Sequence, residues 1–205
     1  MNLLFRRSFT TGLRAGLASL CLVLLQACGV PAPAPPAQPA GGGGAADGFR
    51  LSSVAFADGG PIPARYTCEG LDLSPPLAWS APPAGTLSLA LLVSDPDAPD
   101  PAAPQLTWTH WVRLNLPPEA GRLDEQAGNG PAAPPALDGL NDWGRGGWGG
   151  PCPPVGRHRY QFQLLALDTR LEARGDWTRT QLEEAARGHE LGRARLTGTY
   201  QKSQP

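Results

Sequence analysis

Apolar side chains in this chain recur mainly with the two-residue period of β-strands. Residues 87–93 (LSLALLV) form a continuous apolar run, which is typical of a buried strand. Residues 108–117 alternate instead. Because successive side chains of a strand point to opposite faces, one face is predicted to carry Trp108, His110, Val112, Leu114 and Leu116. Residues 158–168 alternate in the same way, and one face is predicted to carry His158, Tyr160, Phe162 and Leu164.

Shorter segments complete a mostly β pattern. A first strand is expected within residues 49–57, an edge or entry strand at 77–79, and a last strand over 194–200. The chain contains 24 Pro and 26 Gly, and many of them lie in a long stretch of low regularity between residues 116 and 150. About 155 residues are available for folding, enough for one domain with a sizeable core. Together these features favour a mainly β sandwich.

One helix is predicted near the C-terminus. Thr180 and Glu183 have the spacing of a capping box, so the helix is expected to begin there and to run to about residue 191. Gly192 is placed to end it. His189 would lie inside this helix as a surface or packing residue.

The first 27 residues have the pattern of a targeting segment. Arg6, Arg7 and Arg14 precede an apolar run at 17–25, which is too short to span a membrane. The run ends in Leu-Gln-Ala-Cys, which resembles a bacterial lipobox with cleavage before Cys28. We therefore expect residues 1–27 to be a lipoprotein signal peptide and Cys28 to carry lipid. An ordinary secretory signal with a chance cysteine is the alternative.

Residues 28–48 are rich in Pro, Ala and Gly and have no apolar periodicity. Such a composition is typical of a tether, so the folded domain is expected to span residues 49–205. The expected location is that of an exported bacterial lipoprotein, anchored to the cell-envelope membrane on its periplasmic or outer face. Loss of residues 1–27 removes three Arg and no acid, leaving 14 basic and 18 acidic residues, a net charge of about −4. No basic run remains, so nucleic acid is not an expected partner.

Polar side chains gather where the predicted strands end. Asp95 and Asp97 follow the run at 87–93, and Pro96 and Pro99 bar a helix there, so both carboxylates are expected on a rigid loop. His158 and Tyr160 begin a strand after the Gly- and Pro-rich loop at 149–156. An apolar floor with polar groups at its rim and a stiff wall is typical of a pocket mouth. The alternative is that these are ordinary boundary or core residues.

Several motifs resemble those of a known family. The main ones are DPDAP at 95–99, Trp-Thr-His-Trp-Val at 108–112 and GPCPPVGRHRY at 150–160. Supporting stretches are YTCEG at 66–70, SPPLAW at 74–79 and NDWGR at 141–145. In this order they resemble the phosphatidylethanolamine-binding protein (PEBP) family, most of all its bacterial Raf-kinase-inhibitor-like (YbhB/YbcL-like) branch. The likeness runs from about residue 51 to 200; Trp148 departs from it, standing where the branch usually shows Tyr or Phe.

The resemblance implies a PEBP-like fold: two antiparallel sheets in a Greek-key β-sandwich with a few peripheral helices. It implies a site for a small anionic ligand or a phospholipid head group. The implied ligand-binding residues are Asp95, Asp97, Trp108, His110, Gly150, Pro153, Pro154, His158 and Tyr160.

Within the implied site, His110 and His158 would donate hydrogen bonds to the anion. Asp95 would orient a histidine or meet the cationic part of a zwitterion. Backbone N–H groups around residues 149, 150 and 156 would add donors. For Asp97 the alternatives are a turn-stabilising carboxylate or a partner of Arg159.

Cysteine usage adds one expectation. With Cys21 in the signal segment and Cys28 lipidated, Cys68 and Cys152 are the remaining thiols, and two cysteines in an exported domain suggest one disulfide. The alternative is that both are small buried residues. No cofactor, metal ligand or catalytic residue is expected.

The favoured function is a non-enzymatic, membrane-tethered binding or regulatory protein. One alternative is an envelope protein that binds or inhibits a protein partner and has a vestigial pocket. Another is a hydrolase that uses a metal bound by His and Asp, or a His/Asp pair. The chain contains no G-x-S-x-G or H-E-x-x-H motif to support it.

Overall fold

The computed structural model describes residues 48–203, which form two antiparallel sheets, one α-helix and two short 3₁₀ helices. The expected signal peptide, Cys28 and nearly all of the tether lie outside the described residues. The larger sheet has the order β6–β4–β3–β7–β8 and consists of β3 (Ser88–Ala98), β4 (Leu106–Leu116), β6 (Leu137–Asp138), β7 (Arg157–Leu167) and β8 (Glu190–Gln201). The smaller sheet has the order β1–β2–β5 and consists of β1 (Leu51–Ser52), β2 (Leu77–Trp79) and β5 (Arg122–Leu123).

The larger sheet has Greek-key topology. Strands β3, β4 and β6 follow one another across the sheet, and β7 then returns to pair with β3 on the opposite side. The chain thus forms a mainly β structure of two antiparallel sheets, which confirms the predicted fold class.

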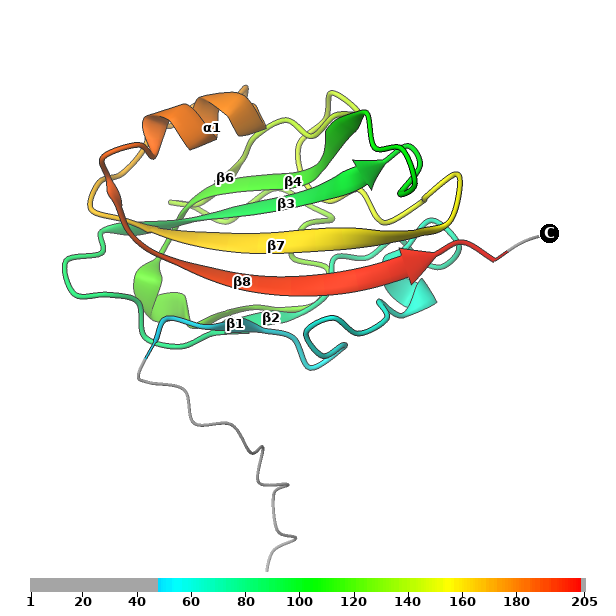
Figure 1. The fold of residues 1–205 in the computed structure, drawn as a ribbon. Coiled ribbons are helices and arrows are strands. Elements are labelled where there is room, and N and C mark those ends of the chain that lie inside the picture. The colour runs from blue at the N-terminus through cyan, green and yellow to red at the C-terminus, as the bar shows by residue number, and fades with distance from the viewer. Residues whose placement is uncertain (1–47, 204–205) are drawn as a thin grey trace, which may run out of the picture. The chain divides into compact units, whose positions relative to one another are not determined.

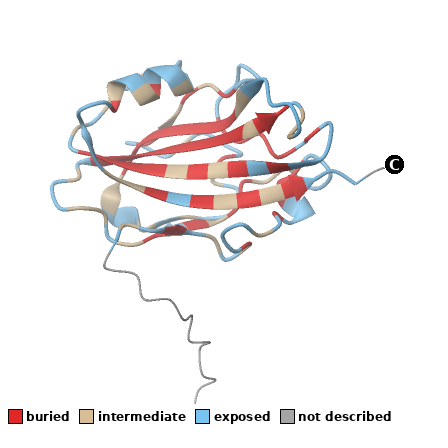
Figure 2. Cartoon of the chain, in the orientation of Figure 1, coloured by how far each residue is buried: buried red, intermediate tan, exposed pale blue. Residues whose placement is uncertain are grey.

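Hydrophobic residues cover both faces of the larger sheet. On one face a cluster joins it to β1 and β2 and includes Leu77, Trp79, Leu91 and Phe162. On the other face a second cluster joins it to α1 (Arg179–Ala185) and includes Leu92 and Leu182. Figure 1 shows α1 on one side of the sheet and β1 and β2 on the other, and Figure 2 shows the middle strands buried along most of their length. This double cover explains why residues 87–93 are apolar without alternation.

Irregular pairing between β3 and β4 decides which side chains share a face. Val93 pairs with Trp111 but Ser94 pairs with Thr109, so one extra residue, His110, is accommodated in β4. As a result His110 and Trp111 both pack beside Trp148. Another register shift lies near Asn115, whose φ is 55°.

These shifts make the predicted face of β4 wrong. Val112 and Leu114 belong to the cluster under α1, whereas Leu116 belongs to the cluster under the small sheet. Strand β3 is also longer than predicted, because it continues through Asp95 and Asp97 to Ala98. Its Pro96 falls within the register shift between Asp95 and Ala98, where the pairing is interrupted.

Other boundaries also differ from the prediction. The first strand is only two residues long, and β2 lies in the middle of its sheet rather than at an edge. The helix begins earlier because Thr178 and Gln181 form the capping box, and it ends at Ala185. His189 therefore lies outside the helix; it is exposed, and its Nδ1 is 2.8 Å from Oδ1 of Asp168. Gly192 lies within β8 and does not end the helix. Among the described residues, no helix has the length and apolar character needed to cross a membrane.

A buried polar cavity at one end of the larger sheet

A cavity of about 420 Å³ lies where the end of β3 meets the beginnings of β4 and β7. We call it the first cavity. The antiparallel order of the three strands brings these positions together, and the loop at 152–154 supplies one wall. Its lining residues are Asp95, Ala98, Pro99, Leu106, Trp108, His110, Trp143, Cys152, Pro153, Pro154, His158 and Tyr160. Seven of the nine ligand residues implied by the resemblance are among them.

A buried hydrogen-bonded pair, Asp95 and His158, lies at the floor of the first cavity. Nδ1 of His158 is 2.7 Å from Oδ2 of Asp95, and the two side chains are 0% and 5% exposed. Nε2 of His158 is 2.9 Å from the carbonyl oxygen of Val155, which only accepts hydrogen bonds, so Nε2 carries a proton. Both ring nitrogens thus contact protein acceptors, and His158 has no nitrogen left to donate to a ligand, contrary to the implied role.

His110 lies on β4 and is held as a neutral ring. Its Nδ1 is 2.6 Å from the carbonyl oxygen of Gly149 and donates to it. Burial lowers the pKa of His110 from 6.5 to about 4, although the hydrogen bond to Gly149 and the charge of Asp95 oppose the shift. At neutral pH the second nitrogen, Nε2, is therefore a free acceptor rather than the donor that the resemblance implied.

Two further polar groups of the cavity residues lack partners in the described part of the chain. These are the hydroxyl of Tyr160 and the indole N–H of Trp108, both buried. Burial, reinforced by the negative charge of Asp95, raises the pKa of Tyr160, so its hydroxyl keeps its proton. Buried polar atoms normally find partners, so these atoms are available to a polar ligand.

Aromatic rings form the side of the first cavity. Trp143 packs edge-on against Trp108 and His110, with ring centroids 5.3 Å and 5.2 Å away, and is itself 45% exposed. His110 also packs edge-on against Tyr160 at 5.1 Å. The sequence did not predict Trp143 as a site residue. Its only signal there was its place in the family-like stretch at 141–145.

Asp97 and Gly150 do not line the first cavity. Asp97 accepts hydrogen bonds from the backbone N–H, Nε and Nη2 of Arg159, which matches the alternative considered for it. The N–H of Gly150 donates to Oδ1 of Asp72 at 2.7 Å, and the N–H of Gly149 donates to the carbonyl of His110. These two N–H groups are therefore occupied by the protein itself and do not point to an oxyanion.

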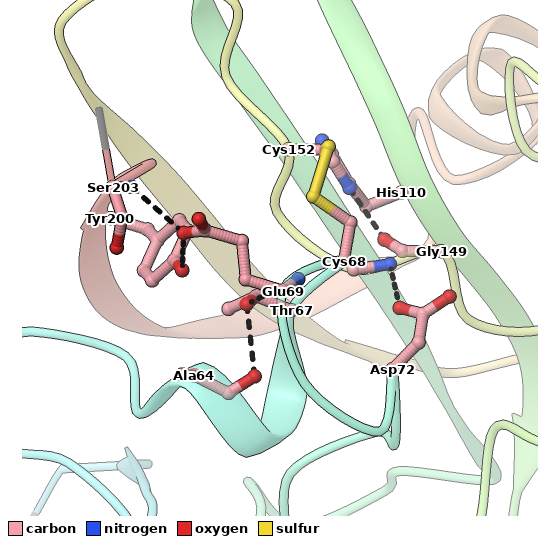
Figure 3. The surroundings of a disulfide bond; sticks show 11 residues. Ala64, Thr67, Cys68, Glu69, Asp72, His110, Gly149, Cys152, Tyr200 and Ser203 are labelled. Atoms are coloured by element: carbon pink, nitrogen blue, oxygen red, sulfur yellow. Dashed lines mark hydrogen bonds between the residues drawn. A yellow bond between two sulfur atoms is a disulfide. The ribbon is translucent and has the colours of Figure 1, made fainter. Parts of the chain in front are cut away.

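A disulfide between Cys68 and Cys152 stands beside the first cavity (Figure 3). The Cα atoms are 5.5 Å apart, and the bond joins positions separated by 84 residues. The N–H of Cys68 also donates to the carbonyl of Pro151 at 3.1 Å. Covalent and hydrogen bonds thus hold the 150–152 segment against the 66–72 segment and fix the position of the cavity wall.

The chemistry of the first cavity is that of a polar floor under an apolar rim. Leu106 and Trp143 are both exposed residues of its lining, and no Lys or Arg among the described residues contributes to it. Within residues 48–203, no cluster of three or more His, Cys, Asp or Glu side chains has the arrangement of a metal site. The arrangement suits a small molecule held by hydrogen bonds at one end and apolar contacts at the other.

These features define a class of small Greek-key β domain with a polar cavity at the end of its main sheet. The family model for phosphatidylethanolamine-binding proteins matches residues 52–201. The chain therefore belongs to the phosphatidylethanolamine-binding protein family.

Relatives and solved structures agree with this assignment. A UPF0098 protein from Methanothermobacter thermautotrophicus is 45% identical over 155 residues, which cover 75% of this chain and 99% of the relative. Another, from Chlamydia pneumoniae, is 44% identical, covering 76% of this chain and all of the relative.

The crystal structure of CT736 from Chlamydia trachomatis, described as a putative PEBP homolog, is 41% identical with a TM-score of 0.70. It covers 77% of this chain and 100% of its own. E. coli YbcL, described as a new member of the mammalian PEBP family, is 32% identical with a TM-score of 0.68 and covers 76% and 99%. The matched part of this chain thus spans the whole of the CT736 chain.

Proposed function

We propose that this protein is a non-enzymatic binding or regulatory protein whose first cavity takes a small anion or a phospholipid head group. The observation that carries the proposal is a set of polar atoms at the first cavity that have no hydrogen-bond partner within residues 48–203. These are the Tyr160 hydroxyl, the Trp108 indole N–H and Nε2 of His110. The exposed apolar residues Leu106 and Trp143 at the same cavity are suited to the hydrocarbon part of an amphiphile.

A charged hydrogen-bond donor for an anion arises in this cavity only when His110 takes up a proton. No Lys or Arg in the described part of the chain lines it, and the neutral His110 ring offers a lone pair at Nε2. An anion placed beside Nε2 favours the protonated ring, because the opposite charge offsets the effect of burial. Protonated His110 then donates to the anion, together with Tyr160 and Trp108.

Binding rather than catalysis is favoured by the commitment of the reactive groups. His158 is fixed by Asp95 and Val155 at both nitrogens, and Cys152, the thiol-type residue of the lining, is tied into a disulfide. The low pKa of His110 makes it a weak general base at neutral pH.

The membrane tether remains part of the proposal. It rests on the lipobox-like residues 25–28 and on the Pro- and Gly-rich segment that follows. More than one acyl chain on Cys28 would give stable anchoring at the envelope membrane. Metabolic labelling with a radioactive fatty acid tests it: label should enter the full-length chain and be absent from Cys28→Ala, whereas equal labelling of both would contradict lipidation.

The ligand is tested by calorimetric titration of residues 49–205 with phosphate, acetate, phosphoethanolamine and short-chain phosphatidylethanolamine. We expect at least one to bind, with affinity lost in His110→Ala and reduced in Tyr160→Phe. His189→Ala is the matched control, because His189 is exposed and does not line the first cavity. Absence of binding by all four would contradict the head-group proposal and favour a protein partner in the envelope.

A further inference from the structure

A second cavity, of about 470 Å³, is lined in part by the same loop that borders the first. The two share no lining residue, although both use the 143–154 segment: Trp143 and residues 152–154 line the first, while Arg145, Gly146 and Trp148 line the second. The rest of the second cavity comes from Asp72, residues 128–132 and residues 136–138. The function proposed above assigns no role to the second cavity.

Two opposite charges of the second cavity are free of ion pairs in the described part of the chain. Asp138 is neutralised by Arg113, which donates to it with Nε and Nη2 at 2.8 and 2.7 Å. Arg145 forms no ion pair there, and Asp72 uses only Oδ1, to accept from Gly150. The cavity therefore has no net charge, with one cation and one anion both able to take further hydrogen bonds.

The environment of Asp72 favours a cationic partner. Burial raises the pKa of its carboxyl, because too little water reaches the group to stabilise its charge, and the charge of Arg145 opposes this only in part. A ligand ammonium placed beside Asp72 would replace the missing hydration.

A buried hydrogen-bond donor completes the set. Trp148 is 2% exposed and lines the second cavity, and its indole N–H has no partner among the described residues. The guanidinium of Arg145 and this N–H are donors only, and the buried N–H in particular requires an acceptor. A planar carboxylate matches the paired N–H groups of arginine.

We propose that the second cavity binds a small zwitterion of the amino-acid or dipeptide type. Its carboxylate is held by Arg145 and Trp148, and its ammonium by Asp72. The net-neutral cavity matches a net-neutral ligand, and Pro131, Ala132 and Leu137 offer apolar surface to its side chain. The volume is sufficient for an amino acid with a large side chain or for a dipeptide.

Residues 49–205 are titrated by calorimetry with each of the common amino acids and with dialanine, at concentrations up to the high millimolar range. For the tightest ligand, two analogues are compared with it: the amide, which lacks the carboxylate, and the deaminated acid, which lacks the ammonium. We expect both analogues to bind roughly tenfold or more weakly, since each loses a hydrogen-bonded charge. Equal binding of either analogue, or no binding by any amino acid or dialanine, would overturn the proposal.

Variants separate this site from the first cavity. Arg145→Gln and Asp72→Asn are expected to weaken the zwitterion roughly tenfold or more. Phosphoethanolamine binding should change much less, because neither residue lines the first cavity and Arg145 meets that lining only at the ring of Trp143. His110→Ala should do the reverse. Arg145 is exposed and Asp72→Asn keeps the acceptor for Gly150, so both variants should fold, which their melting temperatures will report. Unchanged zwitterion affinity in Arg145→Gln would contradict the assignment.

Discussion

Asp95 and His158 are joined by a 2.7 Å contact between Oδ2 and Nδ1 in which a single proton is held between two buried groups. Nε2 of His158 carries its own proton to the Val155 carbonyl, so one further proton resides either on Nδ1 or on Oδ2. In either form the pair has no net charge, which makes its burial tolerable. Its role is to hold the floor of the first cavity in place beneath Tyr160 and His110.

This pair should contribute more to stability than its neighbour Asp97–Arg159. Asp95→Ala leaves His158 buried without its partner and is expected to lower the free energy of unfolding by about 3–5 kcal/mol. Asp97→Ala should lower it by only about 1–2 kcal/mol, because the Arg159 side chain is 59% exposed and water can solvate it. Urea unfolding of both variants gives the comparison. A larger loss in Asp97→Ala than in Asp95→Ala would contradict the burial argument.

Burial of neutral His110 makes the domain sensitive to acid. Its pKa is about 4 when folded and near 6.5 when unfolded, so between these values the unfolded chain binds more protons. The contribution of neutral His110 to the free energy of unfolding is therefore fully present above about pH 6.5. It falls by up to about 3 kcal/mol as the pH drops toward 4.

The acid effect is measured by urea unfolding at pH 7 and pH 4.5, comparing the wild type with His110→Asn. Asparagine retains a donor for the Gly149 carbonyl but does not titrate, so the wild type should lose more stability on acidification. Asp72, whose pKa burial raises, acts in the opposite direction and is present in both proteins. His189→Asn is the control, and an equal pH response in wild type and His110→Asn would contradict the prediction.

Removing the disulfide should destabilise the domain and disturb the first cavity. A bond that closes a loop across 84 residues constrains the unfolded chain by about 4–5 kcal/mol in the chain-entropy model. Cys68→Ser/Cys152→Ser is therefore expected to have a lower midpoint of unfolding, and to bind first-cavity ligands more weakly because Cys152 lines that cavity. With the disulfide intact, the wild type should unfold at a higher midpoint than the double variant. After addition of reductant, the two midpoints should be equal. No change in midpoint on reduction would contradict this account.

Gly150 is required by close packing rather than by backbone conformation. A Cβ there would lie 2.2 Å from Oδ1 of Asp72 and 2.8 Å from the carbonyl oxygen of Tyr66. Gly150→Ala is therefore expected to break the bond to Asp72 and to cost about 1–3 kcal/mol. At Gly130 a Cβ would meet nothing within 4 Å, so Gly130→Ala is the control and should change stability by less than about 0.5 kcal/mol. Equal stabilities of the two variants would contradict the packing argument.

The β pattern could be predicted where local alternation agreed with tertiary packing. In β7 His158, Tyr160, Phe162 and Leu164 share a buried face, as expected, because the pairing with β3 is regular. In β4 the same rule failed, since bulges shift the faces and their positions depend on the partner strand.

Two competing local signals account for the error at the helix. Thr178 with Gln181 and Thr180 with Glu183 both have the spacing of a capping box, and the fold uses the first. Gly188, at a φ of 80°, follows the end of the helix, where Gly192 was expected to act.

Motifs in the sequence indicated many of the residues that line the first cavity, but not the hydrogen bonds between them. Asp95 and His158 are separated by 63 residues, and the sequence does not state which nitrogen meets which acceptor. Trp143 could not be predicted as a site residue, because its contact with His110 depends on the path that the 141–149 loop takes along β4. The sequence alone does not decide the partner of Asp97, because a carboxylate can pair equally well with a neighbouring arginine or with a ligand.

Ligand binding at His110 in the first cavity can be followed by ¹⁵N NMR of the imidazole rings during titration with phosphoethanolamine. The chain has three histidines, so the signals can be assigned by single substitution. Before titration at neutral pH, His110 should show an unprotonated Nε2. On binding, that nitrogen should move toward the protonated position while exposed His189 stays unchanged. Binding seen by calorimetry without any change at His110 would contradict the account.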